Sequence, residues 1–415
     1  MPATGPAQKT RAPLLIILCG CAIACLTFGP RATSGLFLTP ISDANGWGRD
    51  VFAMSFAIQN LLWGVGQPFA GGIADKFGAR RVLIVGGLLY AAGLALMPVS
   101  GAPVAMHFSA GVLIGFALSG ASFSIIIGAF GKLLPEEWRT MGFGFATAAG
   151  SFGQFLFTPL AANLIQSVGW QETLLIFAAL MLLVLPLSLA LATPKAEGAS
   201  LLPGGNQSIA QALAEAFSTP SYWLLVIGFF TCGFHLAFIT VHLPPFLIDK
   251  GLSPAIGGWT LALIGLFNIV GSLSSGALSG RLPKRHILAG IYFARAVLIS
   301  AFVFLPVTPA TALAFGGGIG LLWLSTIPPT SGLVATMFGP RYMTMLYGIV
   351  FLSHQIGSFL GAWLGGVVYK ATGNYDLIWQ LCIAFSIMSA LVNLPIRERP
   401  VAHRPARHAV SRPPR

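Results

Sequence analysis

The stretch Gly71-Gly-Ile-Ala-Asp-Lys-Phe-Gly-Ala-Arg-Arg81 lies between two apolar runs near the start of the chain. A partial copy, Gly276-Ala-Leu-Ser-Gly-Arg-Leu-Pro-Lys-Arg-His286, follows 205 positions later, about half of the 415 residues away. Arg139-Thr-Met-Gly-Phe-Gly144 and Met343-Thr-Met-Leu-Tyr-Gly348 form a second matched pair, separated by 204 positions. Two matches at nearly one offset predict a chain built from two duplicated halves.

The composition places most of this chain in a lipid bilayer. Charged residues make up 8% of the sequence and hydrophobic residues 55%, whereas a soluble domain has roughly 25% charged residues. Runs such as 12–30 and 174–193 carry almost no charge over the length that a membrane helix needs. We expect an all-α membrane protein with twelve transmembrane helices in two six-helix bundles, at 12–40, 51–74, 82–99, 104–131, 140–167, 172–192, 221–247, 255–280, 287–306, 309–335, 342–369 and 375–395.

The basic residues are distributed unevenly between the two sides of this arrangement. The net charge is +12, which in a soluble protein would suggest a nucleic-acid partner. With a cytoplasmic N-terminus, however, eighteen of the 23 Lys and Arg fall on the cytoplasmic side, as the positive-inside rule requires. We therefore expect no nucleic-acid partner, a bacterial-type inner (plasma) membrane location with both termini cytoplasmic, and a monomer in contact with the lipid bilayer.

A polar segment divides the two sets of spans. We expect an N-terminal six-helix lobe over residues 1–193, a cytoplasmic linker over 194–219 with a short helix near Ile209–Phe217, and a C-terminal six-helix lobe over 220–396. The basic, proline-rich residues 397–415 are expected to be a disordered tail, either simply solvated or lying on anionic lipid headgroups. Lys9 and Arg11 before an apolar run resemble a signal peptide, but the run is too long, so an uncleaved first helix is expected.

Asp75 suggests that the basic stretch does more than set the orientation of the chain in the membrane. A carboxylate at the cytoplasmic end of a span can accept hydrogen bonds from a neighbouring helix N-terminus and pair with arginine. Gly71 and Gly78 permit close helix approach and a tight turn. The arginines Arg80 and Arg81 either join this contact or only enforce topology. In the second copy Gly280 stands where the acid should be.

Arg31 is the first of the polar groups expected inside the membrane, where ionisable residues are costly and often functional. Gly29-Pro30 precede it and should loosen the helix. Its planar guanidinium fits a carboxylate, so substrate contact is expected; the alternative is an arginine that extends towards outer headgroups.

His354, in the middle of span eleven, is a substrate or proton-site candidate, with a buried structural histidine as the alternative. His235 and His242 are seven apart, hence on one helix face. They are further proton-site candidates, although a structural hydrogen bond suits both. Asn268, Gln154 and Asn60 are candidates for lining a cavity or for helix packing. Arg295 is expected to make a structural bond to a neighbouring span.

Acidic residues are informative because none falls in the middle of an expected span. Without a buried carboxylate, any proton carried by the protein would have to use histidine. The five cysteines all lie in apolar runs without metal-ligand spacing, and we interpret them as small core residues. No cofactor and no metal are expected, and no nucleophile–base pair suggests an enzyme.

The repeated basic stretch resembles the loop signature of the major facilitator superfamily. This resemblance implies a two-lobed secondary transporter in which Asp75, with Gly71, Gly78, Arg80 and Arg81, forms a conformational latch. From Asn45-Gly-Trp-Gly-Arg49 onward the chain resembles the bacterial monocarboxylate transporter and oxalate:formate antiporter branch.

The resemblance to this branch can be examined at three places in the sequence. Pro30-Arg31 aligns with a Pro-Lys pair of monocarboxylate transporters, and His354 aligns with a lysine of the oxalate:formate exchangers. In span eight, Asn268 and Ser272 stand where monocarboxylate transporters have Asp and Arg. This difference puts lactate-like cargo and proton symport in question.

Three hypotheses follow for the function. The first is a secondary active transporter of a small organic anion, by proton symport or by anion exchange, with alternating access about a midplane site. The second is an exporter of hydrophobic or drug-like compounds, which the 31 Phe and 9 Trp would suit. The third is a transporter-like sensor that binds its ligand without moving it.

Overall fold

The computed structural model describes residues 13–193, 209–339 and 343–401, and within these ranges every regular element is helical. The elements are α1 (Pro13–Ala32), α2 (Ser34–Asn45), α3 (Arg49–Phe77), α4 (Ala79–Leu96), η1 (Met97–Val99), α5 (Pro103–Met106), η2 (His107–Leu113), α6 (Ile114–Gly120), α7 (Phe123–Leu133), α8 (Glu136–Val168), α9 (Trp170–Met181), α10 (Val184–Ser188), η3 (Leu189–Leu191), α11 (Ile209–Phe217), α12 (Pro220–Asp249), α13 (Pro254–Ser279), α14 (Lys284–Phe304), α15 (Pro309–Leu322), α16 (Ile327–Phe338), α17 (Met343–Thr372) and α18 (Asp376–Asn393).

Each of the twelve expected spans falls on one helix or on consecutive helices. Among the described residues, ten helical segments are long and apolar enough to cross a membrane. The two expected spans outside this set are α3 and α8, which are nevertheless helical over 29 and 33 residues. Both carry polar side chains that make hydrogen bonds to the other half of the molecule, Arg49 on α3 and Ser151 and Gln154 on α8, which explains their lower hydropathy.

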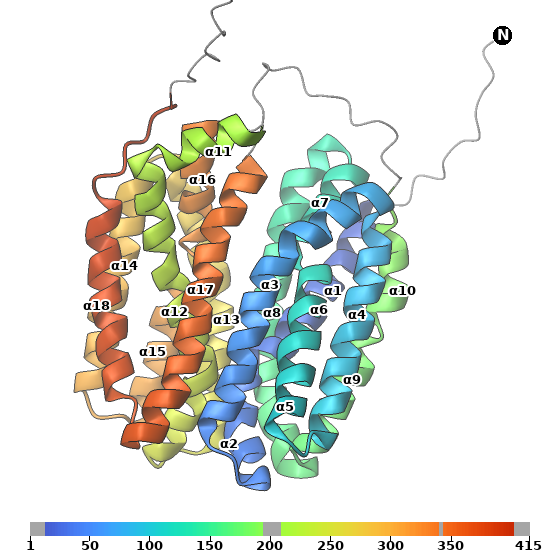
Figure 1. The fold of residues 1–415 in the computed structure, drawn as a ribbon, viewed down its shortest axis with the longest axis vertical. Helices are drawn as coiled ribbons and strands as arrows, with labels where there is room; N and C mark the ends of the chain where they lie inside the picture. The colour runs from blue at the N-terminus through green and yellow to red at the C-terminus, as the bar shows by residue number, and fades with distance from the viewer. Residues whose placement is uncertain (1–12, 194–208, 340–342, 402–415) are drawn as a thin grey trace, which may run out of the picture.

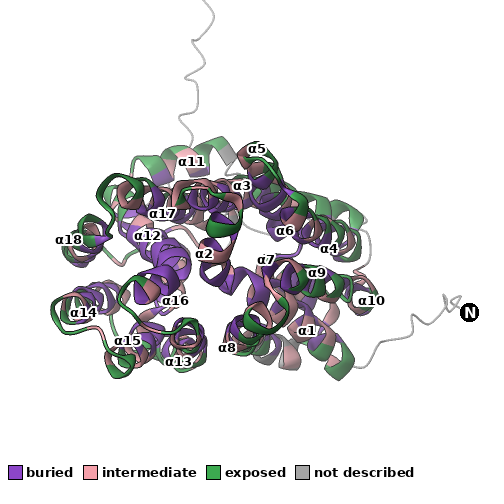
Figure 2. Cartoon of the chain, turned by 90° about the horizontal axis from the view of Figure 1, so that it is seen from below, coloured by how far each residue is buried: buried purple, intermediate pink, exposed green. Residues whose placement is uncertain are grey.

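The helices form two bundles side by side (Figure 1), one of α1–α10 and one of α12–α18. Each bundle has its own apolar clusters, although the largest N-terminal cluster also includes Ala237, Val241 and Ala362 from the second half. Seen along the bundle axis, α12 lies in the interior of the molecule (Figure 2), and most of its residues are buried.

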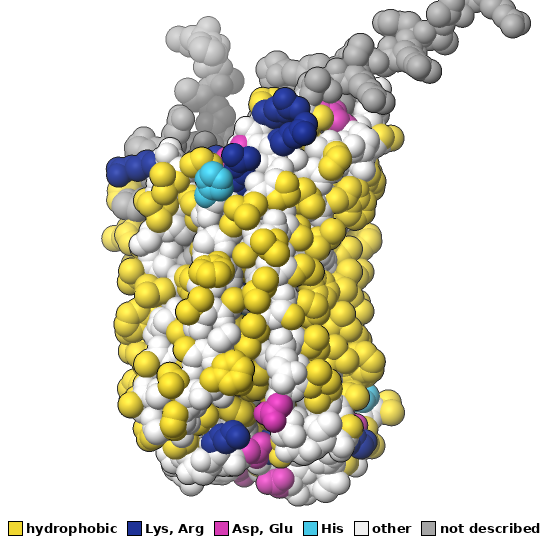
Figure 3. Space-filling model, turned by 90° about the vertical axis from the view of Figure 1, so that its left-hand side faces the viewer, with side chains coloured by type: hydrophobic (Ala, Val, Ile, Leu, Met, Phe, Trp, Pro, Cys, Tyr) yellow, Lys and Arg dark blue, Asp and Glu magenta, His cyan; other side chains and the backbone are white. Residues whose placement is uncertain are grey.

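The molecule has two ends that differ in how closely the bundles approach. We call the end with the α3–α4 turn and α11 the linker end. The far end is the end where α2 meets α3 and where α12 finishes at Asp249. One face of the molecule shows hydrophobic side chains along its length, and most of its charged side chains lie at the two ends (Figure 3). Lys and Arg predominate at the linker end, whereas the far end shows acidic side chains together with a few basic ones.

Glycines on α3 and α17 show where the bundles touch. A side chain at Gly64 would meet Gln355, and one at Gly366, nearer the far end, would meet Ala53. Gly71, two turns after Gly64 and on the same helix face, has no described atom within 4 Å of an added Cβ. These helices therefore pack from the far end to their middle and diverge towards the linker end.

The second contact between the bundles, α8 with α13, has the same geometry. A side chain at Gly265 would overlap the backbone of Ser151, and one at Gly258 would meet Ala162. Gly144, two turns from Ser151 towards the linker end, has no described neighbour within 4 Å of an added Cβ. Among the described residues, the two bundles are thus in contact at the far end and separate towards the linker end.

The basic stretch of residues 71–81 covers the end of α3, the turn at Gly78 and the start of α4. Gly78 has a φ of +93°, a conformation that glycine adopts without strain, and the Ala79 N–H donates to the Thr193 hydroxyl at 3.0 Å. Arg80 and Arg81 are exposed. The side chain of Asp75 lies outside the described part of the chain, as do linker residues 194–208 and tail residues 402–415, so the latch remains a prediction.

Candidate functional site

Arg31 owes its position to a break in the first span. The predicted weakness at Gly29-Pro30 is seen as a helix end at Ala32, with Thr33 between α1 and α2 and the Thr33 hydroxyl donating to the Pro30 carbonyl at 2.7 Å. Proline removes a backbone donor and disrupts the turn before it. Arg31 therefore lies in the last turn of α1, inside the protein, with only 7% of the residue's surface exposed.

Arg31 has neutral partners. Its Nη2 donates to Asn60 Oδ1 at 2.6 Å, and its guanidinium lies over the rings of Trp63 and Phe56, 4.8 Å and 5.4 Å from their centroids. Aromatic faces attract a cation but do not neutralise it. Among the contacts given for the described residues, no carboxylate reaches this guanidinium, so Arg31 holds a buried charge without an anionic partner.

A chain of hydrogen bonds leads from Arg31 into the other bundle. The backbone carbonyl of Asn60, a different oxygen from the Oδ1 that Arg31 binds, accepts from Gln355 Nε2 at 2.9 Å. Gln355 Oε1 in turn lies 2.9 Å from His354 Nδ1. Three predicted site residues, Arg31, Asn60 and His354, are therefore brought together. The residue that joins them, Gln355, was not among the predictions.

His354 is enclosed by aromatic rings. It stacks on Phe351 with ring centroids 5.5 Å apart and an angle of 9°, and it lies 5.0 Å from the Phe229 ring. Phe351 also contacts Trp63 edge-on at 5.6 Å. Since Trp63 also lies beside Arg31, one aromatic layer spans both bundles between the two candidate residues.

A small cavity of about 40 Å³ lies beside Arg31 within the N-terminal bundle. Three buried polar atoms from its lining residues have no hydrogen-bond partner among the described residues, namely Arg31 Nε, Ser34 Oγ and Gln59 Oε1. Buried polar groups are normally paired, so this group of atoms has unused capacity for hydrogen bonding. The other lining residues are Pro30, Phe37, Phe52, Ser55, Phe56, Tyr90, Leu94, Met97, Ala110, Ile114, Leu174 and Phe177.

Asn268 and Gln154 lie at the contact between α8 and α13. Asn268 Nδ2 donates to Ser151 Oγ at 2.9 Å, and its Oδ1 accepts from the Leu324 N–H. Gln154 Nε2 donates to the Leu261 carbonyl at 3.0 Å. Both side chains therefore connect the two bundles, and Ser151 stands at the position that corresponds, 204 residues earlier, to Gln355.

The other two predicted histidines, His235 and His242, have hydrogen-bond partners outside the group formed by Arg31, Asn60 and His354. His235 Nε2 lies 2.9 Å from the Cys382 carbonyl within the C-terminal bundle, which is the structural role that was favoured. His242 Nε2 lies 2.7 Å from the Ala362 carbonyl, and its Nδ1 lies 3.3 Å from the Tyr375 hydroxyl. His242 thus belongs to a second polar group near the far end.

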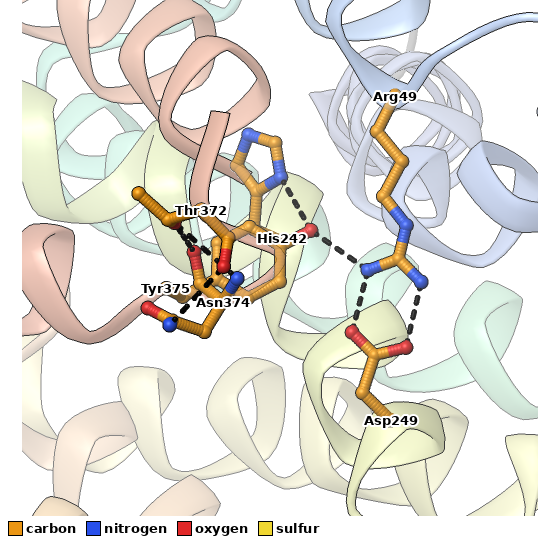
Figure 4. Close-up of polar contacts among 6 residues, drawn as sticks. All are labelled: Arg49, His242, Asp249, Thr372, Asn374 and Tyr375. Carbon is orange, nitrogen blue, oxygen red and sulfur yellow. Dashed lines mark hydrogen bonds and ion pairs between the residues drawn. The ribbon is translucent and has the colours of Figure 1, made fainter. Parts of the chain in front are cut away.

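That second group contains an ion pair between the bundles (Figure 4). Arg49 from the start of α3 binds both carboxylate oxygens of Asp249, the last residue of α12, at 2.7 Å each. Arg49 also donates to the Tyr375 hydroxyl at 3.0 Å and lies 3.9 Å from the Tyr369 ring centroid. We call Arg49, Asp249, Tyr375 and His242 the far-end clamp.

The donors in the far-end clamp can be assigned from the acceptors. A carbonyl only accepts, so His242 Nε2 carries the proton that it shares with Ala362, and its Nδ1 accepts from Tyr375. Burial raises the pKa of the Tyr375 phenol, which keeps the hydroxyl proton in place. Burial lowers the pKa of the Arg49 guanidinium, but its bonds with Asp249 and Tyr375 give a net increase.

A second, more exposed ion pair accompanies the clamp. Lys370 Nζ lies 2.9 Å from Asp50 Oδ2, with 65% of the Lys370 side chain exposed, against 13% for that of Arg49. The signal for both pairs was present in the sequence, because Arg49, Lys250 and Lys370 are the only basic residues expected on that side. The sequence did not show which residues pair, because the partners are 200 positions apart in Arg49–Asp249 and 320 in Asp50–Lys370.

The comparisons with known proteins agree with this geometry. Residues 20–327 match the family profile of the Major Facilitator Superfamily. The chain belongs to this superfamily. Its fold also matches that of a D-xylose-proton symporter, with a TM-score of 0.67 and 17% identity over 93% of this chain and 97% of the other. It is therefore an integral membrane transporter of the major facilitator fold, a family of transporters and not of enzymes.

Curated relatives of this superfamily member cover nearly its whole length. It is 28% identical to the uncharacterized MFS-type transporter YcxA of Bacillus subtilis, over 88% of this chain and 90% of the relative. It is 24% identical to mouse monocarboxylate transporter 11, over 89% and 84%, and 22% identical to the oxalate:formate antiporter of Oxalobacter formigenes, over 91% of each chain. The predicted resemblance to monocarboxylate transporters and the oxalate:formate antiporter is confirmed at the level of distant relatives.

Proposed function

We propose that this superfamily member carries a small organic anion with a carboxylate group across the membrane by alternating access. The observation that carries the proposal is Arg31, a buried cation with neutral and aromatic partners and no acid among its described contacts. An unpaired buried charge is costly, and a bound carboxylate would supply the missing partner. Two relatives whose names specify monocarboxylates and oxalate support the same substrate class.

The cavity beside Arg31 gives the anion suitable polar contacts. Arg31 Nε and the Ser34 hydroxyl can both donate to a carboxylate, in addition to the bond that Arg31 already makes to Asn60. Charge-assisted hydrogen bonds of this kind are among the stronger ones in proteins. We assign Arg31 to carboxylate binding, Asn60 to holding Arg31 in place, and His354 to the polar chain that extends from them. Asn268 and Gln154 are assigned to the contact between bundles.

The conformation fits one step of a transport cycle. If the linker end is cytoplasmic, as the positive-inside pattern predicts, the described residues form the state that is closed to the outside by the far-end clamp.

A thermal-shift screen tests the substrate class. Purified protein is heated with acetate, lactate, oxalate and malonate, and a bound anion raises the unfolding temperature because it binds the folded state. Arg31→Ala should remove the response, while Arg399→Ala, which removes an exposed arginine near the chain end, should keep it. Stabilisation that survives in Arg31→Ala would exclude the proposed role of Arg31. No response from the wild type, with stabilisation by uncharged hydrophobic compounds, would favour the exporter.

A further inference from the structure

Gln59 differs from the other unpaired residues of the cavity beside Arg31. It is 5% exposed, and its Oε1 has no hydrogen-bond partner among the described residues. Arg31 Nε donates and the Ser34 hydroxyl can donate, whereas an amide oxygen only accepts. The cavity therefore offers two hydrogen-bond donors and one acceptor, and a carboxylate by itself uses only the donors.

The orientation of the Gln59 amide follows from its hydrogen bond. Its Nε2 donates to the Ala110 carbonyl at 2.9 Å, and since a carbonyl only accepts, the nitrogen must stand on that side. Ala110 belongs to η2, a π-helix of seven residues, a form that often occurs at functional sites. The packing of η2 on α3 is close, because a side chain at Gly111 would meet the Ser55 carbonyl at 3.0 Å. Oε1 therefore stays the unpaired atom.

The other hydroxyl groups of the cavity lining already use their hydrogens. Ser55 donates to the Val51 carbonyl at 3.0 Å. Tyr90 donates to the Thr27 carbonyl at 3.3 Å. An unpaired buried acceptor is unfavourable, so a ligand that brings a donor for Gln59 Oε1 should bind more tightly than one that does not.

The size of the cavity limits where that donor can be. Its volume is about 40 Å³, which is room for roughly three water molecules. The donor must therefore lie close to the carboxylate in a short molecule. A hydroxyl suits this place better than an ammonium group, because Arg31 already contributes a positive charge and none of the lining residues that the structure describes is an acid.

We propose that the transported anion is a short hydroxy acid with its hydroxyl on the carbon next to the carboxylate. Its carboxylate accepts from Arg31 Nε and the Ser34 hydroxyl, and its own hydroxyl donates to Gln59 Oε1. This inference rests on the proposed function, and it makes Gln59 the residue that determines specificity.

The same arrangement selects against acids that lack the hydroxyl. An oxo acid has nearly the same shape as the hydroxy acid, but it places a second acceptor against Gln59 Oε1, and so does a dicarboxylate such as oxalate. Sites that hydrogen-bond a substrate hydroxyl reject analogues without it, because a buried polar group is then left unpaired.

Isothermal titration calorimetry of the purified full-length protein tests the hydroxyl preference. Glycolate, propionate and glycine have the same number of non-hydrogen atoms and carry a hydroxyl, a methyl or an ammonium group at the same position. At neutral pH we expect the dissociation constant of glycolate to be lower than that of propionate by about tenfold or more, and glycine to bind no more tightly than propionate. Lactate should bind more tightly than pyruvate for the same reason.

Gln59→Leu tests whether Gln59 is the source of this preference. Leucine removes the acceptor, so the affinity for glycolate should fall to that for propionate, while propionate binding is kept. The matched control is Gln67→Leu, the same substitution two turns further along α3, where Gln67 Nε2 bonds the Ser122 hydroxyl; this variant should keep the preference. If Gln59→Leu does not fold because the bond to Ala110 is lost, the comparisons of acids with the wild type decide the question.

The outcomes separate this inference from the function on which it rests. Equal affinities for glycolate and propionate, or tighter binding of pyruvate than of lactate, would overturn the hydroxy acid. A preference for glycolate that persists in Gln59→Leu would overturn the role of Gln59. In each of these cases, acid binding that is lost in Arg31→Ala would still support the proposed function. Acid binding that is absent from the wild type, or that survives in Arg31→Ala, would contradict the proposed function and this inference with it.

Discussion

At the residue scale, the important property of Arg31 is the neutrality of its partner. Asn60 holds the guanidinium at 2.6 Å without cancelling its charge, which leaves that charge for a ligand. A carboxylate in the same place would be nearly isosteric but would compete with the ligand. This makes residue 60 a test of substrate binding that does not depend on removing the arginine.

Asn60→Asp should therefore stabilise the empty protein and abolish anion binding. Replacing a neutral acceptor by a charged one strengthens the bond to arginine by about 1 kcal/mol, so the unfolding temperature without ligand should rise. The stabilisation by carboxylates should disappear, because Arg31 then has an internal counter-ion. Asn60→Ala is the control, since it loses the bond without adding charge. Anion binding that persists in Asn60→Asp would argue against Arg31 as the anion site.

At this scale, the sequence was enough to select the ionisable residues inside the membrane but not the residues that they contact. Arg31 and His354 could be selected because ionisable side chains inside a membrane are rare. Gln355 is adjacent to His354, yet its role depends on the side-by-side packing of α3 and α17. Arg295 makes the expected structural bond, to backbone carbonyls at the end of α15. Gln59 was not selected, because only the fold shows which atom of its amide lacks a partner.

At the element scale, the far-end clamp joins the start of α3 to the end of α12. Its ion pair is bidentate and partly buried, whereas the Asp50–Lys370 pair is largely exposed at the lysine. Exposed pairs contribute little, because solvent screens them. The two pairs therefore make a matched comparison of charge removal at one end of the molecule.

Arg49→Gln should shift the population towards a state that is open at the far end. The loss of the pair and of the bond to Tyr375 removes about 1 kcal/mol of preference for the closed far end, which is a several-fold change in the ratio of states. Spin labels at the exposed positions Ala44 and Ala371 can report this by double electron–electron resonance, as a larger fraction of long distances. Lys370→Ala should change the distribution much less, and an equal effect of both variants would refute the clamp.

At the scale of the whole molecule, two glycines distinguish the end where the bundles are in contact from the end where they are apart. Gly366 is packed against Ala53 and the backbone of Asp50, whereas Gly71 has no described neighbour within 4 Å. If the bundles rock as in related folds, Gly71 should become packed when the linker end closes. The two positions should then respond in opposite ways to a larger side chain.

Gly366→Val should favour the state that is open at the far end, and Gly71→Val should favour the state described here. The same pair of spin labels should show longer distances for the first variant and shorter or unchanged distances for the second. Both variants place the same valine in a membrane helix, so each serves as a control for the general effect of bulk. Shifts in the same direction would mean that the bundles do not rock about this contact.

The overall architecture could be predicted because duplication, hydropathy and charge asymmetry are properties of the sequence alone. The break at Gly29-Pro30, the helix at Ile209–Phe217 and the twelve helical spans all follow from local rules and are found in the structure. The clamp and the polar chain could not be derived in this way. They depend on which residues of two separately folded bundles come to face each other.

The cross-bundle hydrogen bonds near the middle of the helices have a mechanical consequence. Gln355 bonds Asn60 across the α3–α17 contact and Asn268 bonds Ser151 across the α8–α13 contact, and an axis through the two bonds would act as a fulcrum. Gly366 is eleven residues from Gln355, so that part of α17 is a lever arm of about 16 Å. A tilt of about 10° would move its end by about 3 Å, enough to separate an ion pair held at 2.7 Å, while Arg31 beside the fulcrum would hardly move.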